Sequence, residues 1–289
     1  MTLSSLSANF KNYFSLVKFS HTLFSMPFAI TGYFLAINQP NNHFDLYTLA
    51  LVLLCVLFAR NAAMAFNRYA DRQIDAKNPR TQNREIPAKI ITPLSAMMFV
   101  ILNALLFSGA SLLLNNLCFI LSPVALAIVL GYSYAKRFTS MAHLLLGMGL
   151  SLSPIGAYLA VTGEFAMVPV LISFSVLFWV AGFDVIYALQ DEEFDRKNGL
   201  QSIPSRLGKT KALWISGLLH VASAGFLISA SIMSFNFISW IGTAVFLLLL
   251  CYQHVVVGNG RMGRINLAFF TLNGIASLAF ALFAVAGMI

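Results

Sequence analysis

Charged side chains are scarce in this chain. Asp, Glu, Lys and Arg make up 10% of its 289 residues, while apolar types make up 59%, and the mean hydropathy is +0.80. A water-soluble core does not need so much apolar surface, so a soluble fold is excluded. Cysteine is also rare, and Cys55, Cys118 and Cys251 show neither a disulfide framework nor the spacing of metal ligands.

The apolar residues are gathered into long blocks, of which we count nine. A block of about 20 residues spans a bilayer core, and inside lipid it must be helical. The sequence therefore predicts an all-α, multi-pass membrane bundle of nine transmembrane helices. Glycine and proline mark no second domain, so we expect a single domain over residues 1–289. The predicted spans are 16–37, 46–66, 94–114, 117–135, 141–162, 167–187, 212–233, 235–257 and 265–288.

The basic residues predict the orientation of this bundle. Every Lys and Arg except Arg60, which lies inside a span, falls before or at the start of the first span or in alternate connections. That alternation follows the positive-inside rule and predicts a cytoplasmic amino terminus and a carboxyl terminus outside. The formal net charge of +8 is then a consequence of topology and does not indicate a nucleic-acid partner.

The acidic residues are distributed more unevenly still. All of them except Asp45 and Glu164 lie in two places on the predicted cytoplasmic side, within loops of about 67–92 and 184–211. Residues four apart share one face of a helix, and like charges at that spacing destabilise it unless a cation compensates. Asn67, Asp71 and Asp75 in the first loop are four residues apart. Asp184, Tyr187, Asp191 and Asp195 in the second follow steps of three, four and four residues, so they also share one helix face.

Paired carboxylates next to basic residues suggest a metal and a phosphate. Mg²⁺ typically uses one or two carboxylates together with substrate phosphates, and Arg and Lys bind phosphate. In a membrane-embedded chain this combination predicts Mg²⁺ and a diphosphate with a hydrophobic tail. A charged loop is more often simply a solvated loop, but Asp184 still lies at membrane depth, where an ionisable residue indicates function.

These residues resemble the UbiA superfamily of intramembrane aromatic prenyltransferases. The first motif is N-x-x-x-D-x-x-x-D in NRYADRQID, and the second is the aspartate-rich DVIYALQDEEFD. The similarity continues in NREIP, in GYSYAKRFT and in SPIGAYLAVTG, and it covers most of the chain. Within the family, VKFSHTLFSMPFAITGY and KRFT are most similar to polyprenyltransferases that act on 4-hydroxybenzoate-like acids in quinone biosynthesis.

The resemblance implies a reaction and a role for each motif residue. An all-trans polyprenyl diphosphate would lose its diphosphate, and an aromatic acid acceptor would attack the allylic carbon in a cavity that excludes water. The implied metal ligands are Asn67, Asp71, Asp75, Asp191 and Asp195. Asp184 and Tyr187 would lie near the allylic carbon, and Arg72, Lys136 and Arg137 would stabilise the leaving diphosphate. The 76–92 loop is polar and long enough to form a lid.

Two residues inside predicted spans are candidates for binding the acceptor. Arg60 precedes Asn67 by seven residues, which places it on the same helix face and about 10 Å deeper at a rise of 1.5 Å per residue. It could equally extend to the interface or pair with a neighbour. His21 could bind the acceptor or form a bond between helices. The other histidines show no ligand spacing and receive no role: His43, His143, His220 and His254.

Several interpretations remain open at this point. Some members with this type of first helix act in menaquinone biosynthesis on a naphthoate acceptor, and a porphyrin-type acceptor is a further alternative. A transporter with a cytoplasmic cation site is the alternative from another functional class, although its polar groups would be expected near the midplane of several spans. The expected location is the cell inner (cytoplasmic) membrane, with the active site open to the cytoplasm.

Overall fold

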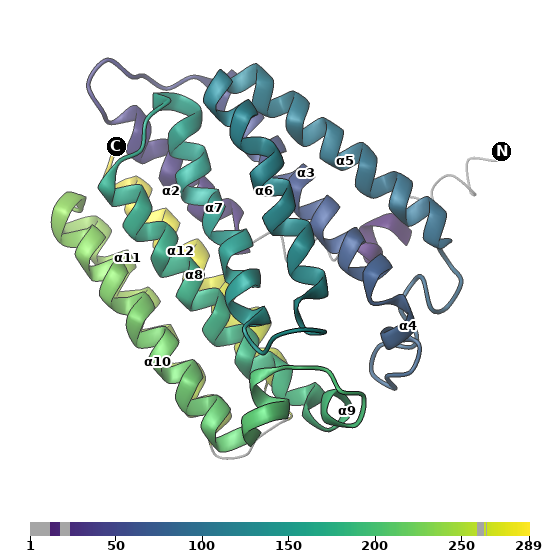
Figure 1. Cartoon of the computed structure of the whole chain (residues 1–289). Helices are drawn as coiled ribbons and strands as arrows, with labels where there is room; N and C mark the ends of the chain where they lie inside the picture. Colours follow the sequence, from purple (N-terminus) through teal and green to yellow (C-terminus); the bar gives the residue numbers. More distant parts are fainter. Residues whose placement is uncertain (1–11, 18–23, 259–262, 264) are drawn as a thin grey trace.

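A computed structural model describes residues 12–17, 24–258, 263 and 265–289, and every regular element within these residues is helical (Figure 1). The predicted all-α class is confirmed. The long helices run alongside one another as a bundle. They are α2 (Met26–Ile37), α3 (Leu46–Ala70), α5 (Pro93–Leu114), α6 (Asn116–Ala135), α7 (Ala142–Thr162), α8 (Met167–Ala188), α10 (Ile203–Ser234), α11 (Phe237–Gly258) and α12 (Asn273–Ala286). The short elements are α4 (Arg72–Asp75), the 3₁₀ turn η2 (Leu189–Asp191), α9 (Glu192–Lys197) and the π-helical turn η4 (Leu267–Leu272).

Eight helical segments of the described chain are long and apolar enough to cross a bilayer. They match the predicted spans from the second to the ninth. The predicted first span, 16–37, includes residues outside the described part, and the helix α2 that represents it there has 12 residues. The protein is therefore an integral membrane protein by its helices, while the total of nine spans and the sides of the two termini stay predictions.

One helix begins well before its predicted start. The span predicted at 212–233 belongs to α10, which starts at Ile203. Ser202 caps its first turn in a capping box with Ser205, so this polar segment is helical despite its low hydropathy. Gly208, with φ of 76°, then interrupts the helical backbone before the apolar part continues. Hydropathy alone could not predict this start of α10, because the first turns are polar and are stabilised by the cap.

The helix α8 lies at the centre of the bundle, packed against α7 and α10. Its buried Trp179, Val180 and Phe183 belong to the main apolar cluster. Glycine allows the closest approach between α7 and α8, because a Cβ on Gly147 would lie 2.3 Å from the carbonyl oxygen of Leu177. Small residues at such crossings are typical of membrane bundles, where packing holds the helices together.

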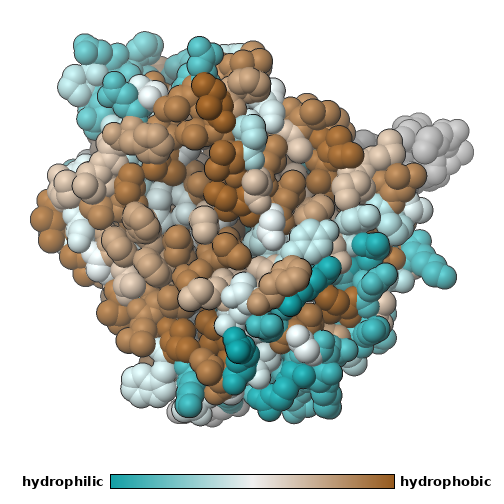
Figure 2. All heavy atoms as spheres, viewed as in Figure 1, coloured by the Kyte–Doolittle hydropathy of each residue, from teal (hydrophilic) through white to brown (hydrophobic). Residues whose placement is uncertain are grey.

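The polar segments gather at the ends of the bundle. Figure 2 shows hydrophobic side chains over the middle of the visible face and hydrophilic ones at opposite ends, one of them the end where Figure 1 places α4 and α9. The first acidic motif begins in the last turn of α3 and continues beyond it, and the second begins in the last turns of α8 and continues beyond that helix. Because α3 and α8 reach the same end, the fold brings together two motifs that are more than a hundred residues apart.

Candidate active site

A cavity of about 560 Å³ opens inside this end of the bundle, and both acidic motifs line it. The helix α3 stops at Ala70, and Asp71 caps it before the separate turn α4, so the first motif is not on one continuous helix as we had expected. Hydrogen bonds from Asp71 N to Asn67 O and from Asp75 N to Asp71 O, 2.9 and 2.7 Å, nevertheless preserve the helical spacing. The motif residues that line the cavity are Asn67, Asp71, Asp75, Asp184, Tyr187, Asp191 and Asp195.

The second motif is bound to the 76–92 loop. Arg80 donates to Asp191 through Nε at 2.9 Å and pairs with it again through Nη2, and Asn78 donates to the same carboxylate at 3.0 Å. Arg80 also donates to the Tyr187 hydroxyl at 3.0 Å, and its guanidinium lies 5.3 Å from the centre of that ring. The loop that follows the first motif therefore crosses the cavity entrance and binds the second.

The first motif has its own arginine partners. Arg84 donates to Asp75 Oδ1 at 2.7 Å, and Arg137 donates to Asp71 Oδ1 at 3.2 Å and to the carbonyl oxygen of Ala70 at 2.6 Å. Asn67 donates to the other Asp71 oxygen at 3.2 Å. Burial raises the pKa of Asp71 in spite of the hydrogen bond from Arg137. Each acidic motif is thus compensated by cations of the chain itself.

Lys136 lies between the two motifs. Burial lowers the pKa of this ammonium group, but the nearby charges of Asp184, Asp195, Asp191 and Asp71 outweigh burial and raise it above its ordinary value. Burial likewise opposes the charge on Arg80, yet the hydrogen bond and charge of Asp191 raise the pKa of Arg80. Both groups remain cationic near neutral pH, which suits them to hold a phosphate.

The carboxylates fit a divalent cation that is shared with a ligand. Among the described residues, no three His, Cys, Asp or Glu side chains lie close enough to hold a metal ion by themselves. However, Asp75 Oδ2 and Asp195 Oδ2 are buried without a hydrogen-bond partner in the described chain. Such oxygens suit Mg²⁺, which accepts one or two carboxylates and completes its shell with phosphate oxygens and water. The residues therefore fit a metal that binds together with a diphosphate.

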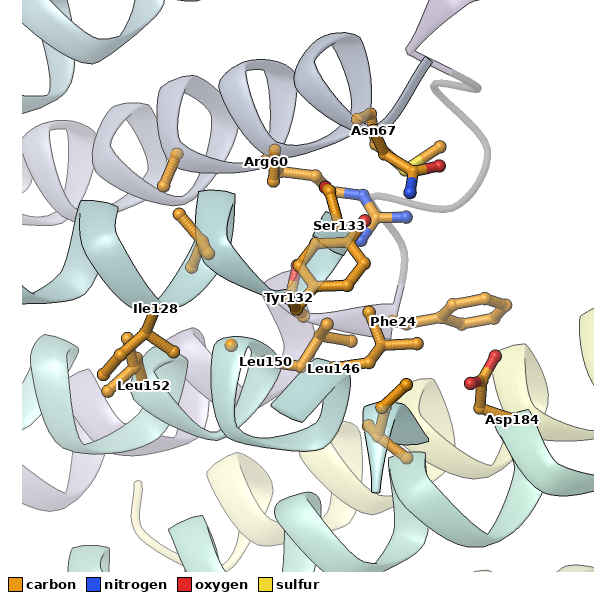
Figure 3. A pocket seen from close by; sticks show the side chains of 18 of the residues that line it. Phe24, Arg60, Asn67, Ile128, Tyr132, Ser133, Leu146, Leu150, Leu152 and Asp184 are labelled. Atoms are coloured by element: carbon orange, nitrogen blue, oxygen red, sulfur yellow. The ribbon is translucent and has the colours of Figure 1, made fainter. Parts of the chain in front are cut away.

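The deeper part of the cavity is apolar, and Arg60 extends its charged group into it. It is lined from α3, α5, α6 and α7 by Val56, Cys55, Phe107, Leu121, Ile128, Leu146, Leu150 and Leu152, among others. Arg60 extends into it from α3 beside Tyr132 and Ser133 of α6, as Figure 3 shows. Its Nε atom is buried and has no hydrogen-bond partner in the described part of the chain. Of the other arginines that line the cavity, Arg80, Arg84 and Arg137 each have a carboxylate partner. Arg68 is buried, and its Nε atom likewise has no partner in the described chain.

Two of the predicted site residues do not join this arrangement. Arg72 is not among the described residues that line the cavity, since its guanidinium donates to the carbonyl oxygen of Tyr69 at 2.7 Å and lies 4.4 Å from the centre of that ring. Its one-residue offset from Asp71 turns it to another side of the helix. His21 lies outside the described residues, so its predicted role in acceptor binding is untested.

Other residues of the site were missed. Asn78, Arg80 and Arg84 line the cavity, and the sequence showed only that they lie in a polar loop, not which of them turn inward. His143 received no role, yet its Nδ1 lies 2.7 Å from Asp184 Oδ2. Spacing could not find this pair, because the two residues lie on different helices that meet only in the folded bundle.

The comparisons with known proteins agree with these motifs. Residues 25–286 match the UbiA prenyltransferase family. The chain belongs to this family. That finding confirms the resemblance noted in the sequence and the prediction of an enzyme of the aromatic polyprenyltransferase type, and it sets the transporter interpretation aside.

Two relatives of this chain are named as 4-hydroxybenzoate prenyltransferases. The chain is 31% identical over 221 residues to the 4-hydroxybenzoate octaprenyltransferase of Idiomarina loihiensis, covering 76% of this chain and 77% of that protein. It is 36% identical over 172 residues to the mitochondrial 4-hydroxybenzoate polyprenyltransferase of Arabidopsis thaliana. That match covers 59% of this chain and 42% of the plant protein, less than half its length.

Solved structures share the fold. An apo UbiA homologue from Aeropyrum pernix K1 superposes with a TM-score of 0.83 at 33% identity, covering 93% of this chain and 98% of that one. A UbiA homologue from Archaeoglobus fulgidus, solved with GPP and Mg²⁺, gives a TM-score of 0.77 at 20% identity and covers 96% of this chain and 99% of its own. The bundle described above is therefore the fold of this family.

Proposed function

We propose that this protein transfers a polyprenyl group from polyprenyl diphosphate to a 4-hydroxybenzoate-like aromatic acid, with Mg²⁺, in ubiquinone biosynthesis. The observation that carries the proposal is a cavity with two paired-carboxylate motifs at its entrance and, in its apolar interior, Arg60, whose buried Nε atom has no partner among the described residues. Such a cavity offers separate places for a diphosphate and for a carboxylated acceptor. The names of the relatives and the GPP and Mg²⁺ bound to the Archaeoglobus homologue support the same assignment.

The entrance binds the diphosphate. Asn67, Asp71, Asp75, Asp191 and Asp195 are the proposed ligands of Mg²⁺, which when bound would stabilise the charge on the leaving diphosphate. Lys136 and Arg137 are placed to donate to diphosphate oxygens, because both line the cavity between the motifs. Arg80 and Arg84 are further donors there. Arg72 has no place in this proposal, since its guanidinium is engaged with Tyr69.

The interior binds the tail and the acceptor. Apolar side chains line it, and it reaches Val124 and Phe165, which are 56% and 60% exposed on the outside of the bundle. A tail longer than the cavity can therefore continue into the bilayer. Arg60 is the proposed partner of the acceptor carboxylate, which would satisfy its buried Nε atom. Asp184 and Tyr187 also line the cavity, and they are the proposed residues near the allylic carbon.

The chemistry at that point is a substitution on an aromatic ring. The allylic C–O bond breaks and its electron pair leaves with the diphosphate, while a ring carbon of the acceptor bonds to the allylic carbon and then loses its proton. An aromatic face can stabilise the positive charge that develops on the allylic group. Tyr187 would offer such a face once Arg80, whose guanidinium lies over the ring in the described structure, turns to the diphosphate. An apolar cavity excludes the water that would otherwise capture this group.

An acceptor panel tests the proposal. The purified protein, supplied with one polyprenyl diphosphate and Mg²⁺, should prenylate 4-hydroxybenzoate, with the product identified by mass spectrometry. Exclusive prenylation of a hydroxynaphthoate would instead assign the protein to menaquinone biosynthesis, and no prenylation of any aromatic acid would refute the proposal. The proposed location is the cell inner membrane, with the cavity entrance on the cytoplasmic side that the basic loops predict.

A further inference from the structure

We infer that His143 is a positioning residue, which holds the carboxylate of Asp184 as the acceptor of the proton that the aromatic ring loses. The inference rests on the proposed function and adds to it a residue outside both acidic motifs. Its starting point is a buried pair: the His143 ring is fully buried, and its Nδ1 atom lies 2.7 Å from Asp184 Oδ2.

The second nitrogen of the ring decides which way the proton points. The backbone N–H of Ile203 is directed at His143 Nε2, with 3.4 Å between the nitrogen atoms. An N–H group can only donate, so Nε2 must be the acceptor and the ring proton must lie on Nδ1. His143 therefore donates to Asp184. A second proton on Nε2 would face the N–H of Ile203, so this arrangement favours a ring with one proton, which points at Asp184.

The Ile203 N–H is itself held in place. Ile203 is the first residue of α10, and the first N–H groups of a helix have no partner within it. The capping box between Ser202 and Ser205 fixes the backbone at this turn, with bonds of 2.9 and 3.3 Å. His143 thus accepts a hydrogen bond from the first N–H of α10 and donates one to the carboxylate of Asp184. Residues that hydrogen-bond to a reactive side chain in this way fix its orientation.

The packing of α7 on α8 fixes the distance between His143 and Asp184. Gly147 lies one turn beyond His143 on the same face of α7, and a Cβ there would lie 2.3 Å from Leu177 O and 3.4 Å from Ala181 N of α8, so the two helices pack closely at this point. Leu177 and Ala181 lie seven and three residues before Asp184, hence on the same face of α8. The crossing of the two helices therefore brings the ring and the carboxylate together without a flexible loop.

Asp184 lies where it could accept a proton from a bound acceptor ring. Asp184 lines the cavity together with Tyr187 and Phe24, and Figure 3 shows its carboxylate directed into the space in front of Arg60 and Tyr132. A ring bound to Arg60 by its carboxylate would present its reacting carbon toward this space. As the C–C bond forms, the ring proton passes to Asp184. The hydrogen bond from His143 fixes the direction in which the carboxylate accepts it.

Three variants at one position separate positioning from packing. Asn places an amide N–H near the Nδ1 position, Gln extends its amide toward the Nε2 position, and Phe fills the same space with no hydrogen bond. We expect His143→Asn to keep kcat within about threefold of wild type. His143→Phe and His143→Gln should lose about 10- to 100-fold in kcat, the loss expected for one hydrogen bond to a charged group, with KM for polyprenyl diphosphate unchanged.

The order of the three variants in activity shows whether His143 positions Asp184 or only fills space. If His143 only filled space, Phe would be tolerated better than the smaller Asn, and that order would overturn the inference, as would equal activity of Asn and Gln. Where the Phe variant fails to fold, the comparison of Asn with Gln still decides it. The diphosphate released per molecule of prenylated product should also rise in the slow variants, because the allylic group is then lost to water.

A double-mutant cycle provides an independent test. If His143 acts through Asp184, then His143→Phe should cost nothing further in an Asp184→Ala background, whereas independent residues would give additive losses and refute the inference. A failure of the proposed function would look different, because wild type itself would not prenylate any aromatic acid. Should wild type prefer another acceptor, the same order of variants applies with that acceptor.

Discussion

Replacing Arg60 with Met tests the proposed acceptor site most directly. The substitution keeps the length and apolar stem of the side chain and removes its charge and its donors. In the described structure the Arg60 Nε atom is buried without a partner, so the ligand-free protein bears a desolvated cation with little compensation. Removing it should therefore leave thermal stability unchanged or slightly higher, which separates a loss of binding from a loss of fold.

The expected size of the effect follows from the bond that is lost. A hydrogen bond to a charged group contributes about 1.5–3 kcal/mol, and a factor of ten in affinity corresponds to about 1.4 kcal/mol. Arg60→Met should therefore raise KM for 4-hydroxybenzoate by about 10- to 150-fold. KM for polyprenyl diphosphate should stay within about twofold, because the diphosphate is bound at the entrance by other cations.

The assay compares the acid with its methyl ester. Wild type should prefer the acid, and Arg60→Met should lose that preference because no cation then distinguishes the two acceptors. Arg206→Met is the matched control, since Arg206 is exposed and is not among the described residues that line the cavity. If Arg60→Met still prefers the acid, or raises both KM values equally, then Arg60 does not bind the acceptor carboxylate.

Three further outcomes are expected of the entrance. Asp75→Asn and Asp191→Asn should each lower kcat by about 10²- to 10³-fold while the protein still folds, since removing one transition-state charge contact typically costs that much. Near-normal turnover in either variant would contradict the metal assignment. Arg137→Gln should raise KM for polyprenyl diphosphate by about tenfold and leave KM for the acceptor unchanged, and the reverse pattern would place Arg137 elsewhere. EDTA should stop product formation in wild type and Mg²⁺ should restore it, as followed by mass spectrometry.

The sequence was sufficient for the fold class and for the location of the two motifs. Long apolar blocks have one structural solution in lipid, so eight of the predicted spans correspond to helices of the described chain. The four-residue spacing of Asn67, Asp71 and Asp75 survived the break in the helix at Asp71, because the hydrogen bonds across the break remain helical. Local pattern therefore predicted what depends on local hydrogen bonding.

Contacts between distant segments could not be predicted in the same way. Arg80 and Asp191 are separated by more than a hundred residues, and nothing in the loop distinguishes Arg80 from Lys77 before the chain folds. His143 was equally hidden, because its partner lies on another helix and its second contact is a backbone N–H. Burial of polar groups forces them to find partners, but only the packing of the helices determines which partners they find.

The charges that line the cavity lead to one more prediction. Its described lining contains five aspartates and six cationic side chains, so in the absence of ligands the acids are nearly balanced by arginine and lysine. A diphosphate that entered alone would make the site strongly negative, and Mg²⁺ that entered alone would compete with Arg80 and Arg84 for Asp191 and Asp75. When the diphosphate and Mg²⁺ bind together, the net charge of the site changes little. Binding of each should therefore depend on the other.

Linkage makes this dependence measurable and reciprocal. If Mg²⁺ strengthens the binding of an unreactive prenyl diphosphate analogue by some factor, the analogue must strengthen the binding of Mg²⁺ by the same factor. We expect that factor to be at least about tenfold, measured by calorimetry on the purified protein at fixed ionic strength. Neutralising one loop cation with Arg84→Gln should free Asp75 from its partner and so strengthen the binding of Mg²⁺ alone. Unlinked binding, or weaker binding of Mg²⁺ in Arg84→Gln, would show that the arginines of the loop do not occupy the metal-binding oxygens.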